Sequence, residues 1–169
     1  HSFYRALARI SNERPAGTGL RNLAIRELDA TDECVAQACR IEGLEVLTLD
    51  GIDATRGIVD AILGGAAAAT LTTVSIRYCA YAPRPTALRA CDVLRLVQGL
   101  PRMKHLSWFC DEEFQKGTLL LWGVCREIAR LLERRGGRVA VRPRPTYSGA
   151  SRNQTALWDK LRSEGWTWR

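Results

Sequence analysis

The chain has 169 residues, of which 46% are hydrophobic and 25% charged, a balance that excludes a disordered chain and a collagen-like fibre. No apolar run approaches the roughly 20 residues that a bilayer-spanning helix needs, so we expect no transmembrane segment. The 25 basic residues exceed the 18 acidic ones by 7, and 22 of the 25 are arginine, which favours planar contacts with carboxylates, phosphates or aromatic rings.

The first segment has the pattern of an amphipathic helix. Phe3, Leu7 and Ile10 follow helical spacing, and arginines stand between them. Two interpretations remain open. The segment resembles the end of an organelle presequence region, and its apolar stripe equally fits a helix that covers the end of the fold. We take residues 1–19 as an N-terminal capping helix and loop.

An apolar pattern of the form L-x-x-L-x-L recurs along the chain. The intervals between its second apolar positions are 24, 27, 32 and 33 residues, the length of a strand plus a helix. Residues 20–146 are therefore predicted to form an α/β solenoid of four to five strand-helix units, each stabilised by its neighbours. The copies are Leu20, Leu23 and Ile25; Leu44, Leu47 and Leu49; Leu71, Val74 and Ile76; Met103, Leu106 and Trp108; and a degenerate fifth copy at Val139 and Val141.

Helical periodicity fills the intervals between these strands. Thr31 or Asp32 can cap the first helix, and Asp53 or Thr55 the second. A fourth helix is expected from about residue 117 to 135, where two glycines follow it. The third helix follows two prolines and carries on its apolar face Leu88, Cys91, Leu94 and Val97.

The last segment is rich in tryptophan. A helix over about residues 151–164 would present Leu157, Trp158 and Leu161, and Trp166 and Trp168 follow it. Because the terminal units of a solenoid leave an open apolar end, we predict that residues 147–169 form a C-terminal capping helix with a Trp-rich tail.

These residues resemble the cysteine-containing leucine-rich repeat, in which the strand pattern is followed by a cysteine, a Thr-Asp helix start and a second cysteine. The first unit has Leu28 at the first cysteine position, then Thr31-Asp32 and Cys39, and the third unit has Cys79. The resemblance covers about residues 20–110. The second unit departs from it with Ile52 at the cysteine position, and the prolines before the third helix also break the pattern.

Members of this family include the substrate-recognition arms of F-box ubiquitin ligases and a mitochondrial group similar to ATP synthase coupling factor B and respiratory-complex assembly factors. The short length and basic charge are closer to the mitochondrial group. The resemblance implies a non-catalytic, protein-binding scaffold, an accessory or assembly subunit of a respiratory-chain or ATP synthase complex. We expect it in mitochondria, or otherwise in another reducing intracellular compartment.

Alternate strand residues of such a solenoid would line an exposed concave face of the sheet. Small residues predict a shallow trough there, in the column Ala24, Thr48, Ser75, Ser107 and Ala140. Larger side chains along its margin suit protein binding, because arginine and tyrosine often carry interface energy. The predicted protein-binding residues are Arg26, Asp50, Arg77, Tyr78, His105 and Phe109.

A run of arginines stands near the C-terminal end of the repeats. It could contact an acidic partner protein or phosphates, so an RNA-contacting accessory protein of a ribonucleoprotein, such as a mitochondrial ribosome, is the alternative function. The candidate contact residues are Arg130, Arg134, Arg135, Arg138, Arg142 and Arg144.

We expect no catalytic residues, metal or cofactor. Asp50 and Asp53 could serve a small doubly wound enzyme, yet no phosphate-binding glycine loop accompanies them. His105 is the only internal histidine, and the cysteines lack the spacing of a zinc site. Six cysteines spread through the chain are expected as small buried side chains in a reducing compartment: Cys34, Cys39, Cys79, Cys91, Cys110 and Cys125.

Overall fold

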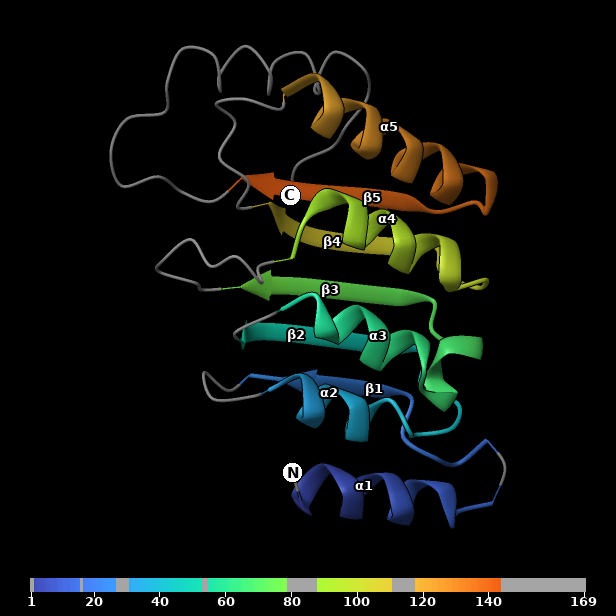
Figure 1. Cartoon of the computed structure of the whole chain (residues 1–169). Helices are drawn as coiled ribbons and strands as arrows, with labels where there is room; N and C mark the ends of the chain where they lie inside the picture. Colours follow the sequence, from blue (N-terminus) through green and yellow to red (C-terminus); the bar gives the residue numbers. More distant parts are fainter. Residues whose placement is uncertain are drawn as a thin grey trace.

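A computed structural model describes residues 2–15, 17–26, 31–52, 55–78, 88–110 and 118–143. Within these ranges the chain is an α/β fold in which strands and helices alternate (Figure 1). The strands are β1 (Asn22–Ile25), β2 (Val46–Ile52), β3 (Thr73–Tyr78), β4 (His105–Cys110) and β5 (Arg138–Pro143). The helices are α1 (Ser2–Asn12), α2 (Asp32–Ala38), α3 (Gly57–Leu63), α4 (Ala90–Gly99) and α5 (Thr118–Arg134), with a 3-10 turn η1 (Ala66–Ala69).

The strands form one parallel sheet in chain order, β1-β2-β3-β4-β5. Leu23, Leu47, Val74, Leu106 and Val139 lie in register across it, so the 24-, 27-, 32- and 33-residue intervals of the sequence are confirmed. Successive units are joined by backbone hydrogen bonds, in which one carbonyl at the start of a unit accepts two N–H groups of the next unit. Arg21 O accepts the N–H groups of Glu45 and Val46, Glu45 O accepts those of Thr72 and Thr73, and Thr72 O accepts those of Lys104 and His105.

The described helices cover one face of this sheet (Figure 1). Each contacts the next along the chain, from α1 against α2 to α4 against α5. The burial of β2 alternates accordingly, because Leu47 and Leu49 are buried whereas Val46, Thr48 and Asp50 are only half-buried. A doubly wound sheet would carry helices on both faces. The described helices lie on one face and the strands follow chain order, so this part of the chain does not have the doubly wound arrangement.

The core lies between the sheet and the helix layer. The strand residues predicted to face inward are buried there, and Trp108 is among the largest fully buried side chains. Leu23 of β1 and Val139 of β5 are exceptions, since these residues of the edge strands are only partly buried. From the helices the core receives Val35, Ile58, Val59, Ile62, Val93, Leu96, Val97, Ile128 and Leu132.

Two expectations about buried faces are wrong. The face of α1 that covers the end of the fold carries Tyr4, Ala8 and Ser11, while Phe3 and Ile10 of the predicted stripe are 66% and 50% exposed. This face packs toward α2, and the hydroxyl of the buried Ser11 accepts the N–H of Leu20. On α4, Cys91 of the predicted apolar face is exposed, whereas Cys34, Cys39 and Cys125 are buried as expected.

Candidate interaction surface on the sheet

The face of the sheet that none of the described helices covers carries a column of five small residues. Ala24 is opposite Thr48, Thr48 opposite Ser75, Ser75 opposite Ser107, and Ser107 opposite Ala140. We call this set the small-residue column. Because these side chains are short, another chain can approach the sheet closely along this line. The register confirms the column that the repeat spacing predicted.

Asp50 and Arg77 stand beside the small-residue column. They are opposite each other on β2 and β3, with Asp50 Oδ2 3.9 Å from Arg77 Nη1. The pairing shifts between Asp50 and Ile52, where Gly51 has a φ of 70°, and such a bulge turns the neighbouring side chains. Among the described residues Arg77 Nε has no hydrogen-bond partner although it is buried. The guanidinium therefore keeps an unused donor on this face.

The other margin residues are placed as follows. Arg26 is exposed directly after β1. His105 is exposed on β4 and lies in register with Thr73 and with Arg138 of β5. Phe109 pairs with Arg142 through the backbone, and Tyr78 ends β3. The side chains of Tyr78, Phe109 and Arg142 lie outside what the structure describes.

The predicted contact arginines near the C-terminal end of the repeats differ in their exposure and in their contacts. Arg130 and Arg134 are exposed on α5, Arg130 within 4.0 Å of Glu127, and Arg138 is exposed on β5. Arg135 instead donates from Nη1 to Val97 O at 3.0 Å and to Leu100 O at 2.9 Å. Its guanidinium thus satisfies carbonyls at the C-terminal end of α4 and holds α4 against α5. Arg144 lies outside the described residues, as do the predicted cap over residues 147–169, Asp53 and Cys79.

In the described ranges no three His, Cys, Asp or Glu side chains could hold one metal ion. Burial raises the pKa of the Cys39 thiol to about 12, so this cysteine stays protonated and unreactive at neutral pH. None of the helices within those ranges is long and apolar enough to cross a membrane.

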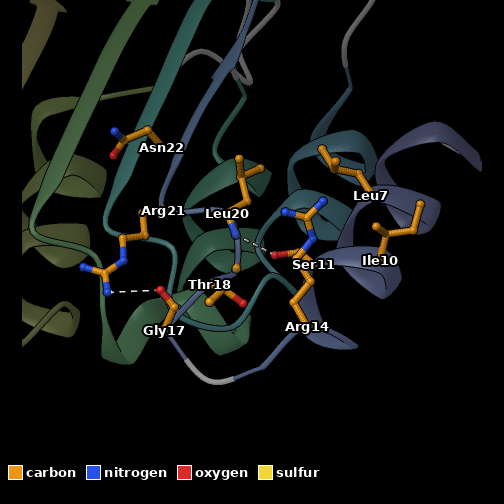
Figure 2. Close-up of a pocket in the computed structure, with 10 residues that line it drawn as sticks. Leu7, Ile10, Ser11, Arg14, Gly17, Thr18, Leu20, Arg21 and Asn22 are labelled. Atoms are coloured by element: carbon orange, nitrogen blue, oxygen red, sulfur yellow. Dashed lines mark hydrogen bonds between the residues drawn. The ribbon is translucent and has the colours of Figure 1, made fainter.

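A hollow beside α1 was not predicted from the sequence. It has a volume of about 470 Å³ and lies between α1 and the segment that leads into β1. Figure 2 shows Leu7 and Ile10 on the helix, Arg14 just after its end, and Leu20 and Asn22 on the segment that leads into β1. The signal for it was the stripe of Phe3, Leu7 and Ile10, which sequence analysis assigned to the capping face.

No protein-family model matches this chain, and no curated protein matches it.

Proposed function

We propose that this protein is a short leucine-rich-repeat solenoid that binds other protein subunits through the exposed face of its sheet, without catalysis. In this proposal it is an accessory or assembly subunit of a larger complex, of the mitochondrial respiratory chain or ATP synthase. The basic, arginine-rich composition and the resemblance of residues 20–110 to cysteine-containing repeats support that assignment.

The repeating geometry supports the solenoid. A solenoid requires parallel strands in chain order, one helical layer and equivalent contacts between successive units. The sheet order meets the first requirement, and the contacts between neighbouring helices meet the second. The shared-carbonyl contact at Arg21, Glu45 and Thr72 repeats at Lys104, whose carbonyl accepts the N–H of Arg138. The two prolines before α4 interrupt the sequence pattern without interrupting this series.

The observation that carries protein binding is the partly accessible guanidinium of Arg77 beside the small-residue column, where 44% of the side chain is exposed. Asp50 does not saturate this group, since its Oδ2 is 3.9 Å from Nη1 of Arg77. A carboxylate or carbonyl of a partner chain lying over the small-residue column could bond the accessible part of the guanidinium, whereas Nε itself is buried. Such charge-assisted bonds are among the stronger contacts in protein interfaces.

The test is quantitative affinity purification from the native cells. Arg77→Ala combined with Phe109→Ala should remove the subunits that co-purify with the unaltered chain, and mass spectrometry would measure that loss. Arg95→Ala is the matched control, because Arg95 is exposed on α4, in the helical layer, where it pairs with Asp60. Full retention of the co-purifying subunits by the double variant would contradict the proposal.

The alternative, an RNA-contacting subunit, draws on the exposed Arg130, Arg134 and Arg138. Contact with phosphates releases counterions, so affinity for RNA would fall steeply with salt. Titration with a generic RNA distinguishes the two functions. Tight binding that falls by about a hundredfold or more from low to moderate salt, and that is lost in Arg130→Ala/Arg134→Ala/Arg138→Ala, would favour RNA.

A further inference from the structure

β1 has an unpaired edge. It pairs with β2 only, and no other described strand lies on its far side. Arg21 O accepts N–H groups from Glu45 and Val46, so the backbone of Arg21 faces β2. In a parallel ladder the backbone groups of successive residues face opposite neighbours, and those of Asn22 and Ala24 therefore point outward. An open edge of this kind is a template for a further strand.

Apolar surface lies beside this edge. Among the described residues Phe3 and Ile10 are the two exposed large apolar side chains, and both stand on the same face of α1 as Leu7. Leu7 and Ile10 line the hollow together with Leu20 (Figure 2). Leu23 faces the core yet remains partly exposed, whereas its register partners Leu47 and Val74 are fully buried. The end of the core at β1 is thus open to an apolar side chain from outside.

The same region is strongly basic. Residues 2–26 contain five arginines and one acidic residue, Glu13. Arg9 pairs with Glu13 and Arg21 with Glu45, but Arg5, Arg14 and Arg26 have no acidic partner among the described residues. Two copies of the chain meeting at β1 would bring these like charges together. The charge therefore favours an acidic occupant over a second copy.

We propose that an extended, acidic segment of a partner protein adds a strand to the free edge of β1. Its backbone pairs with Asn22 and Ala24, an apolar side chain enters the hollow between Leu7, Ile10 and Leu20, and its carboxylates meet Arg14 and Arg26. A nucleic acid would satisfy the arginines and leave the strand edge and the apolar stripe unused. This edge site shares only Ala24 with the small-residue column, and it uses the outward backbone of that residue, not its side chain.

The test uses a fluorescein-labelled peptide of eight residues in which glutamate alternates with valine and leucine, and a matched peptide with lysine for glutamate. Fluorescence anisotropy should show binding of the acidic peptide and an affinity at least about tenfold lower for the basic one. Ala24→Pro removes the outward N–H without touching the ladder to β2, and it should weaken binding by about tenfold or more. In spectra of the ¹⁵N-labelled protein, the amides of Asn22 and Ala24 should shift on binding.

Ile10→Ser removes apolar surface from the hollow and should also weaken binding by about tenfold. Because Ile10 is half exposed, this variant keeps the fold and decides the question if Ala24→Pro does not fold. Arg126→Glu, on the exposed side of α5, is the control and should change affinity by less than about twofold.

Three results would overturn the proposal. The first is absence of binding, or equal binding of the two peptides. The second is unchanged affinity in Ile10→Ser. The third is a dimer in sedimentation equilibrium that Ala24→Pro abolishes, because it would assign the edge to a second copy of the chain.

Discussion

Asp50 Oδ2 and Arg77 Nη1 stand 3.9 Å apart on neighbouring strands of the exposed sheet face, where 32% and 44% of the two side chains are accessible. At this distance and exposure the pair contributes little to folding, because solvent screens it. The pair is therefore available for recognition, and its loss should be felt in binding far more than in stability.

Arg77→Ala should change the free energy of unfolding by less than about 1 kcal/mol. The variant loses a weak ion pair and at the same time removes a buried donor that lacks a partner. Urea denaturation of the purified chain measures the difference. A loss greater than about 3 kcal/mol would show that Arg77 serves the fold and would weaken its assignment to an interface.

Gly65→Ala should destabilise the chain by about 1–3 kcal/mol. A Cβ at Gly65 would stand 2.5 Å from the carbonyl oxygen of Cys39, which accepts the N–H of Ala67 at 2.9 Å. The same change at Gly123, on the exposed side of α5 with nothing within 4 Å, should stabilise by about 0.5–1 kcal/mol. Thermal and urea unfolding would measure the change in stability of each variant. The comparison separates the effect of close packing from that of helix propensity. Equal effects at the two sites would contradict this explanation.

Arg135→Ala should cost about 1–3 kcal/mol, because the carbonyls of Val97 and Leu100 lose a charged donor. Arg134→Ala, one residue earlier and exposed, should change stability by less than about 0.5 kcal/mol. Hydrogen exchange would show faster exchange near the C-terminal end of α4 in the first variant alone. If both variants behave alike, the contact between Arg135 and α4 does not stabilise the fold.

The stability of the chain should depend on Cys39 at high pH. Burial raises the pKa of its thiol from 9.0 to about 12 in the folded state. Above pH 9 the unfolded chain loses this proton and the folded chain keeps it, so stability falls by about 1.4 kcal/mol per pH unit until about pH 12. Below pH 9 the contribution is complete.

A matched variant isolates the contribution of the Cys39 thiol to the stability of the chain. Cys39→Ala lacks the thiol, and the stability difference between the unaltered chain and this variant should narrow as the pH rises from 9 to 11 in urea titrations. A difference that stays constant over this range would show that the Cys39 thiol is not protected from solvent in the folded chain.

The repeat was readable from the sequence, because a strand needs one apolar side at period two. Leu47, Val74 and Leu106 marked both the inward positions and the spacing, and the register of the sheet followed from them. The small-residue column was predictable for the same reason. Thr31, one of the two candidate caps of α2, does stand at the position before the helix, although its side chain makes no capping hydrogen bond.

Contacts between units required the tertiary structure. Two consecutive arginines at the end of α5 look equivalent in the sequence, yet Arg135 reaches α4 and Arg134 does not. The apolar stripe of α1 predicted the wrong buried face, because the side of the helix that packs toward α2 carries Tyr4 and Ala8. Periodicity reports which side chains are apolar, whereas the shape of the neighbouring unit decides which of them are covered. The open edge of β1 and the hollow beside it depend on this packing between units, which periodicity does not report.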